Sequence, residues 1–391
     1  MKESQHTYAA AVESALSIAI DTGRIPGASY AVERDGNEVA RGYLGLADME
    51  TAKPVTDRTL FQYASMTKPV TALAVADLVT RGGLSLDDRL TKFFPSLEPS
   101  PVTTIRFTRE LTDLAEADDR VALQLAEQHL HSPPVPPLEA VTIRHLLTHS
   151  SGLGQGPGSS FRVGRAIGQA VSLEDRVCRF LSIPGDYQPG ENHVYSPIVA
   201  FDILARIVEV VTATPFAEYL DSRIFRPAGM NSTGFSIPDD RLADLATMYT
   251  TGPTGLVPAS TQRGRSEQPS GAQGLVGTLD DYIRFARILA TQGTIDRVRV
   301  MSPAAIALLT DSGWNLESTL GEAHWGLGVA IVDQETDYRS RGSWGWSGRF
   351  GTHFYIDPAR QETFVLMVNQ WDIGGASSAV SRAAERALYR T

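Results

Sequence analysis

Short β-rich runs lie at both ends of this 391-residue chain, and the long segment between them is mostly helical in pattern. Residues 27–45, GASYAVERDGNEVARGYLG, predict a hairpin, because two strand-like runs flank the turn residues Asp35 and Gly36. Strand-like runs return in HWGLGVAIVD, GRFGTHFYIDP and ETFVLMVNQ, and a helical pattern near 376–389 closes the chain. The order β, then α, then β indicates that the two ends share one sheet and that the middle is an insertion.

This order also predicts the division into domains. Residues 1–85 and 300–391 are expected to form an α/β domain, and residues 86–299 a mostly helical domain. The fold class is therefore α/β plus a helical lobe. We expect the active site in the cleft between the two parts, where ligand sites commonly lie.

Two helices are predicted around the first hairpin. Residues 66–81 predict a buried helix, because apolar positions occur almost all round it and Gly82-Gly83 follows. The N-terminal stretch predicts an amphipathic helix, since apolar residues recur there at helical spacing. Its predicted buried face carries Tyr8, Ala11, Ala15, Ile18 and Ala19.

Composition narrows the classes of partner. A net charge of −10 without a long basic run argues against a nucleic-acid partner. The single cysteine, Cys178, excludes an internal disulfide and a metal site built on thiolates. Glu13 and Asp21 interrupt the N-terminal apolar stretch, so no signal peptide is expected, and no apolar run of about 18 residues predicts a membrane span. We expect a cytoplasmic protein that needs no cofactor and has no membrane partner.

Lysine is rare in this chain, with four residues against 31 arginines, and Lys68 lies three residues after Ser65. On a helix these two residues share a face. A serine hydroxyl needs a base to become a good nucleophile, and a lysine of lowered pKa can serve where an arginine cannot. Pro69 is best tolerated near a helix start, so the helix should begin near Ser65 and present free N–H groups there.

The pattern Ser-x-x-Lys is weak evidence alone, because chance produces it often. Tyr195 precedes an apolar helix in PGENHVYSP, where a tyrosine is usually a packed residue with a satisfied hydroxyl. It becomes a candidate proton shuttle only if Ser65 and Lys68 are functional. The Gly-rich run SWGWSGRFGTHFYIDP indicates either close approach of a ligand to the backbone or a bulged edge strand.

Together these segments resemble the serine β-lactamase and penicillin-binding-protein superfamily. The resemblance is to its class C β-lactamase-like branch, and above all to the family VIII carboxylesterases. LFQYASMTKPVTALAV is similar to the nucleophile block, VTIRHLLTHSSGLG to the "LLTHTSGL" block and PGENHVYSP to the Pro-Gly…Tyr-x-Asn block. The resemblance implies an antiparallel sheet flanked by helices with a helical insertion. It also implies Ser65 as nucleophile, Lys68 as general base and Tyr195 as catalytic tyrosine.

Two departures from the lactamase pattern bear on the substrate. The Lys-Thr-Gly element is replaced by Trp346-Ser347-Gly348, which is similar to the Trp-Gly-Gly of the esterases; a second register would place Ser343-Trp344-Gly345 there. Neither register supplies the lysine that helps hold a substrate carboxylate, although Arg349 could substitute. Pro197 stands where lactamases have an asparagine, so that side-chain hydrogen bond to a substrate amide is lost.

The resemblance therefore implies a serine carboxylesterase that hydrolyses small esters through an acyl-enzyme on Ser65. Backbone N–H groups of Ser65 and Arg349 would form the oxyanion hole, beside Trp346, Ser347 and Gly348. An acyltransferase, a weak class C-type β-lactamase or D-amino-acid peptidase, and an inactive ligand-binding relative are the alternatives. The oligomeric state is left open.

Two further features have competing interpretations. His145 and His149 adjoin two serines and suggest a Ser-His triad, but the resemblance makes this block structural. The chain has no Gly-x-Ser-x-Gly motif, which argues against an α/β-hydrolase. Residues 98–140 contain a helical pattern and a Pro-rich tail, and they form either a lid over the site rim or a surface insertion.

Overall fold

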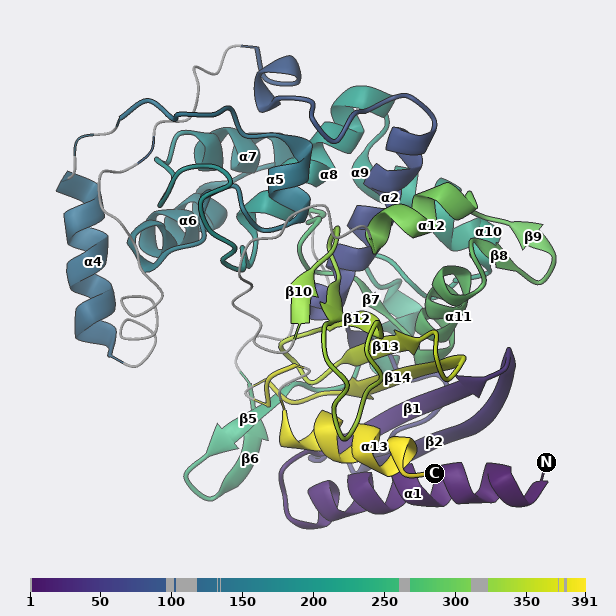
Figure 1. Ribbon diagram of the computed structural model, residues 1–391. Coiled ribbons are helices and arrows are strands. Elements are labelled where there is room, and N and C mark those ends of the chain that lie inside the picture. Colours follow the sequence, from purple (N-terminus) through teal and green to yellow (C-terminus); the bar gives the residue numbers. More distant parts are fainter. Residues whose placement is uncertain are drawn as a thin grey trace.

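The computed structural model describes residues 2–95, 102, 118–131, 133, 135–259, 268–310, 323–371, 373–375 and 378–391. Its centre is an eight-stranded antiparallel sheet (Figure 1). In spatial order the strands are β10 (Ala323–Trp325), β11 (Ala330–Val332), β12 (Trp344–Ser347), β13 (His353–Asp357), β14 (Glu362–Val368), β1 (Gly27–Arg34), β2 (Asn37–Asp48) and β3 (Lys53–Pro54).

The two ends of the chain meet in this sheet, as predicted. β1 pairs with β14 in a register that runs from Ala28 opposite Val368 to Arg34 opposite Glu362. The predicted hairpin is also confirmed, because β1 and β2 are joined by two residues of positive φ, Asp35 (50°) and Gly36 (73°). A two-residue turn with this backbone matches the twist of the strands it joins.

Helices cover both faces of the sheet. α1 (Lys2–Asp21) and α13 (Ala379–Tyr389) lie together on one face, seen at the bottom of Figure 1. α11 (Leu279–Ala290) packs against β1, β13 and β14, and its Tyr282 ring contacts that of Phe354. Neighbouring residues of β13 belong to separate apolar clusters, Phe354 with α11 and Tyr355 with α1 and α13. The strands therefore alternate between two cores, as a pleated strand requires.

The N-terminal helix exists as predicted, but its predicted buried face is only partly right, because Tyr8 and Ala19 are buried while Ala11, Ala15 and Ile18 are not. The buried positions are Tyr8, Val12, Leu16 and Ala19, whereas Ile18 is 63% exposed. This stripe places the larger Val12 and Leu16 side chains on the sheet, which buries more apolar surface than the alanines of the predicted face.

The predicted helix after Ser65 is confirmed as α2 (Thr67–Thr80), which a short turn, η1 (Ala64–Met66), precedes. α2 is buried almost throughout and packs between α8 (Val199–Thr212) and α12 (Pro303–Leu309). The other helices are η2 (Leu90–Lys92), α4 (Asp119–His131), α5 (Ile143–Leu147), α6 (Pro157–Gln169), α7 (Leu173–Leu181), α9 (Phe216–Leu220), η3 (Asp221–Phe225), α10 (Arg226–Ala228) and η4 (Asp239–Asp244). Among the described residues there are also three two-stranded ribbons: β4 (Phe61–Gln62) with β7 (Val276–Gly277), β5 (Tyr249–Gly252) with β6 (Gly255–Pro258), and β8 (Thr294–Ile295) with β9 (Val298–Arg299).

The domain boundaries at residues 85 and 300 remain a prediction. The predicted lid falls partly outside the described residues, because 98–101, 103–117, 132 and 134 are not among them. Of the rest, α4 packs against α6. Among the described helices, none combines the length and the apolar character that a membrane crossing needs.

Candidate active site

Ser65 lies in η1, at the entrance of α2. The preceding residue, Ala64, has a φ of 49°, a left-handed conformation that costs a non-glycine residue energy. Tyr63 anchors the approach to this turn, because its N–H donates to Leu275 O at 2.9 Å and its hydroxyl donates to Thr278 O at 2.7 Å. The strained turn and its anchors leave Ser65 partly exposed between buried neighbours.

Lys68 is fully buried one helical turn after Ser65. Its Nζ lies 3.3 Å from Ser65 Oγ, 2.7 Å from the carbonyl oxygen of Pro197 and 3.0 Å from that of Ala272. A neutral amine has two N–H donors and one lone pair. If Lys68 acts as the neutral base, donors on these two carbonyls would leave its lone pair for the Ser65 proton.

Tyr195 approaches Ser65 from the other side. Its hydroxyl donates to Ser65 Oγ at 2.8 Å, and its ring centroid lies 4.9 Å from Lys68 Nζ. The structure therefore brings together the three residues predicted as the catalytic set, although they come from η1, α2 and the segment before α8.

His149 holds the Tyr195 segment in place. The N–H of Ser196 donates to His149 Nδ1 at 3.0 Å, so the ring proton is on Nε2. The ring lies among Tyr195, Phe201 and Trp325. Burial lowers the pKa of His149 well below its usual value, and the charge of Lys68 adds to the shift. His149 is thus a neutral structural group.

The other histidine of this block caps a helix. His145 accepts from the N–H of Thr142 at 3.2 Å, within a capping box at the start of α5. The adjoining serines bond elsewhere: Ser150 Oγ pairs with Thr148 Oγ1 at 2.9 Å, and Ser151 Oγ donates to Gln155 at 3.4 Å. These contacts support the structural interpretation over a Ser-His triad.

Comparison with known proteins agrees with this geometry. The sequence profile of the family described as beta-lactamase matches residues 9–388. The chain belongs to the beta-lactamase family. Esterase EstB of Burkholderia gladioli is 30% identical, with 98% of this chain and 95% of that protein covered. The lovastatin esterase of Penicillium rubens is 31% identical over 75% of this chain and 71% of its own.

Solved structures show the same fold. EstCE1, described as a hydrolase with promiscuous acyltransferase activity, superposes with a TM-score of 0.77 at 23% identity, covering 98% of this chain and 99% of that one. Simvastatin synthase (LovD) of Aspergillus terreus reaches a TM-score of 0.75 at 21% identity, with 97% of both chains covered. At these identities the likeness is one of fold.

The family's third element lies on β12 and the turn after it. The Trp346 ring centroid is 5.3 Å from that of Tyr195, so this side chain faces the catalytic residues. A Cβ on Gly348 would lie 2.4 Å from Tyr63 O, which shows how closely the turn approaches the backbone before Ser65. These contacts favour the register Trp346-Ser347-Gly348 over Ser343-Trp344-Gly345.

Arg349 and Ser347 point elsewhere than Trp346. The guanidinium of Arg349 stacks over Trp371, 5.1 Å from the ring centroid, and the side chain is exposed. Ser347 Oγ bonds to His353 Nδ1 at 2.7 Å, on the opposite face of β12 from Trp346. Ser347 could therefore contact a substrate only through its backbone atoms.

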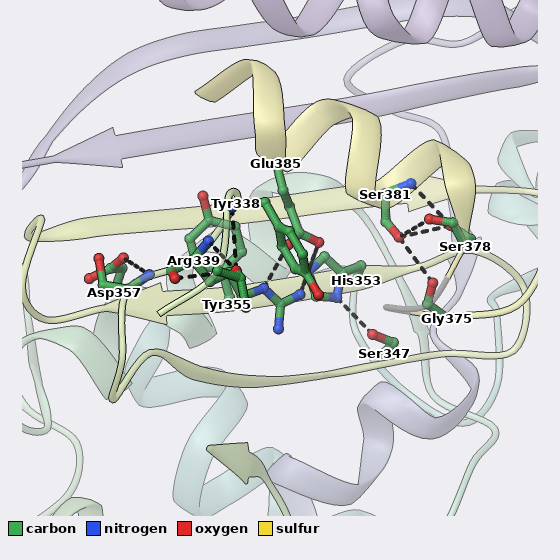
Figure 2. Close-up of polar contacts among 12 residues, drawn as sticks. Tyr338, Arg339, Ser347, His353, Tyr355, Asp357, Gly375, Ser378, Ser381 and Glu385 are labelled. Carbon is green, nitrogen blue, oxygen red and sulfur yellow. Dashed lines mark hydrogen bonds and ion pairs between the residues drawn. The ribbon is translucent and has the colours of Figure 1, made fainter. Parts of the chain in front are cut away.

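A buried polar network supports β12 from that opposite face (Figure 2). His353 Nε2 lies 3.0 Å from Glu385, on α13, and Arg339 donates to both oxygens of Glu385 at 2.6 and 2.9 Å. Burial raises the pKa of Glu385, but the charges of Arg339 and His353 outweigh it and bring the pKa to about 2. The network ties the C-terminal helix to the strand that carries the turn beside Ser65.

A small cavity opens beside the nucleophile. Its volume is about 110 Å³, and its wall combines apolar residues such as Ala64, Ile167 and Trp371 with the charged Arg176 and Asp202. A larger cavity of about 430 Å³ lies against α11 and is lined mainly by paired arginines and aspartates, without any of the predicted site residues. The smaller cavity is the candidate substrate pocket, because its wall includes Ala64, the residue directly before Ser65. Among the described residues, no group of three or more His, Cys, Asp or Glu side chains is arranged to hold a metal ion.

Sequence reasoning missed two members of this site, the carbonyls of Pro197 and Ala272. The sequence analysis considered Pro197 only as the loss of an asparagine side chain, whereas its backbone oxygen contacts Lys68. Ala272 lies in Ser270-Gly271-Ala272, where a Cβ on Gly271 would lie 2.1 Å from Phe201 O. A glycine in such a run indicates close backbone approach, and that is the one signal in the sequence that could have located this segment.

Proposed function

We propose that this chain is a serine esterase that cleaves small esters through an acyl-enzyme on Ser65. The observation that carries the proposal is the placement of Ser65 Oγ between Lys68 Nζ, at 3.3 Å, and the Tyr195 hydroxyl, at 2.8 Å. A nucleophile in hydrogen-bond reach of both a base and a proton donor has what acyl transfer needs. The names of EstB and the lovastatin esterase support the same reaction class.

In the acylation step, Ser65 Oγ attacks the ester carbonyl carbon and its proton passes to Lys68. The tetrahedral oxyanion takes hydrogen bonds from the backbone N–H groups of Ser65 and Arg349, each worth about 3 kcal/mol. The C–O bond to the alcohol then breaks as Tyr195 gives its phenol proton to the leaving oxygen, and the Lys68 ammonium returns its proton to Tyr195, so that both groups regain their starting forms. Water cleaves the acyl-enzyme by the same path in reverse.

The surroundings of Ser65 support a small substrate without an obligatory negative charge. Trp346 occupies the place where lactamases carry a lysine, and the adjoining cavity of about 110 Å³ is well below the usual size of a drug-binding pocket. The apolar part of its wall, which includes Ile167, Ile198 and Phe350, suits a short acyl or alcohol group. The absence of a lysine from this element removes one charge-assisted contact with a substrate carboxylate, worth about 1.5–3 kcal/mol. We also propose that the protein is cytoplasmic, as expected from its sequence.

The test compares kcat/KM for a p-nitrophenyl ester and for a chromogenic cephalosporin on one preparation. We expect efficient turnover of short-chain esters and slow or no turnover of the cephalosporin. Equal or faster turnover of the cephalosporin would contradict the esterase assignment and would make Arg349 the first candidate for a carboxylate-binding cation.

A further inference from the structure

A buried ion pair lies behind Lys68, outside the three catalytic residues. Arg176, on α7, places its Nε 2.7 Å from Oδ2 of Asp202, on α8. Their side chains are only 8% and 0% exposed. Burying two charges costs free energy unless each has polar partners, so the contacts of this pair indicate what the pair does.

Both members of the pair form hydrogen bonds with one short segment, residues 269–272. Asp202 Oδ1 accepts from the Ser270 hydroxyl and, at 3.4 Å, from the N–H of Ala272. Arg176 donates to the carbonyl of Pro269 at 2.6 Å. The carbonyl at the end of this segment, Ala272 O, is the acceptor that lies 3.0 Å from Lys68 Nζ. A continuous chain of contacts thus runs from Arg176 to the general base.

The segment has little freedom to settle elsewhere. The Thr71 hydroxyl of α2 donates to Gly271 O at 2.7 Å, and Gly271 packs directly on the Phe201 carbonyl of α8. Contacts from α2 thus fix one side of the segment, and Asp202 and Arg176 fix the other. With both sets of contacts in place, Ala272 O is held at a fixed position relative to Lys68.

The pair also governs the charge around Lys68. The groups that face Lys68 are the hydroxyl of Ser65, the phenol of Tyr195, the neutral ring of His149 and the carboxyl of Asp202. Burial raises the pKa of Asp202, and the neighbouring Arg176 charge opposes that shift most strongly. An Asp202 carboxylate without its Arg176 partner would favour the ammonium form of Lys68, which cannot accept the Ser65 proton.

We propose that Arg176 and Asp202 are positioning residues for Lys68: together they fix the Ala272 carbonyl, and Arg176 offsets the carboxylate charge that would otherwise hold Lys68 as an ammonium ion. This inference rests on the proposed function, because Lys68 must be the base of an esterase. It assigns a role to a charge pair that lines the cavity beside Ser65 but makes no contact with the nucleophile itself.

The experiment follows the pH dependence of kcat/KM for a p-nitrophenyl ester. Arg176→Gln leaves the Asp202 charge uncompensated, so the acid limb should move to higher pH by about one unit, an approximately tenfold loss of kcat/KM below the limb. Asp202→Asn leaves the Arg176 charge and should move the limb to lower pH. The double variant carries neither charge, so its limb should return to the wild-type position while kcat stays reduced, because Ala272 is less well held.

Arg223→Gln is the matched control. It breaks another ion pair with a buried partner, Asp77, farther along α2, so it should lower stability and leave the acid limb in place. Acid limbs that coincide in Arg176→Gln, Asp202→Asn and wild type would overturn the inference, whatever the loss of activity. If one single variant does not fold, the opposite shift expected of the other still decides. A wild-type enzyme with no esterase activity would instead contradict the proposed function.

Discussion

The carbonyl oxygen of Pro197 accepts a hydrogen bond from Lys68 Nζ at 2.7 Å. Pro197 lacks the asparagine side chain that binds a substrate amide in lactamases, but its backbone carbonyl contacts the proposed general base. Together with Ala272 O, it holds Lys68 Nζ within reach of Ser65 Oγ. The chain thus keeps the base that ester hydrolysis needs, but it lacks the side chain that would bind a substrate amide.

The first prediction concerns Lys68 as the base. Lys68→Arg keeps a positive charge but cannot accept a proton at working pH, so kcat/KM for an ester should fall at least about 10²-fold. The measurement is kcat/KM with folding checked by circular dichroism. A loss of only a few fold would show that Lys68 acts as a fixed charge and that Tyr195 is the base.

The second prediction concerns the turn beside the nucleophile. Gly348→Ala would place a Cβ 2.1 Å from Thr352 Oγ1 and 2.4 Å from Tyr63 O, so the turn must move away from Ser65. We expect kcat to fall about 10²-fold, the scale of one lost oxyanion donor, with a smaller change in KM. Gly164→Ala is the control, because a Cβ there meets nothing within 4 Å and should favour α6. Unchanged kcat in Gly348→Ala would contradict the oxyanion role of this turn.

The third prediction concerns stability and pH. The folded-state pKa of Glu385, about 2, lies below its usual value of 4.5, so its stabilising contribution is present above pH 4.5 and is lost as pH falls towards 2. Glu385→Gln leaves Arg339 buried without its partner and should lower the free energy of unfolding by about 3–5 kcal/mol at pH 7. The deficit relative to wild type should shrink between pH 4.5 and pH 2, as measured by urea unfolding.

The control for Glu385→Gln breaks an ion pair made by another residue of the same helix. Asp337→Asn breaks the exposed ion pair with Arg386 of α13 and should change the free energy of unfolding little. A deficit in Glu385→Gln that is independent of pH would show that its cause is packing rather than charge.

The fourth prediction concerns the cavity beside Ser65. Ile167→Ala removes part of the cavity wall and makes the cavity larger, so a longer acyl chain should fit better. The ratio of kcat/KM for a hexanoate ester to that for an acetate ester should therefore rise. Phe161→Ala changes an exposed residue of the same helix and should leave the ratio unchanged. The same ratio in both variants would mean that the acyl chain binds elsewhere.

Much of the fold could be predicted from the sequence. The Asp35-Gly36 turn, the apolar run after Ser65 and the return of strand patterns at the C-terminus are local signals, and each corresponds to an observed element. The buried face of α1 was predicted only in part, because its exact position depends on the sheet beneath it rather than on the helix alone.

The site was only partly predictable. Ser65 and Lys68 are one helical turn apart, so their spacing alone suggested a contact, whereas the part played by Tyr195 came from the family resemblance. Backbone carbonyls leave no mark in a residue pattern, and the pairing of Arg176 with Asp202 depends on how α7 packs on α8. Such contacts become visible only when the tertiary structure is known.

The most direct test of the account is the identity of the acylated residue. Brief incubation with a p-nitrophenyl ester, or with an active-site phosphonate, followed by acid quench and peptide mass spectrometry should find a single modified residue, Ser65. Ser65→Ala should show neither the modification nor turnover, and Tyr195→Phe should be modified more slowly. Modification of another residue, or turnover near the wild-type rate in Ser65→Ala, would contradict the assignment of Ser65 as the nucleophile.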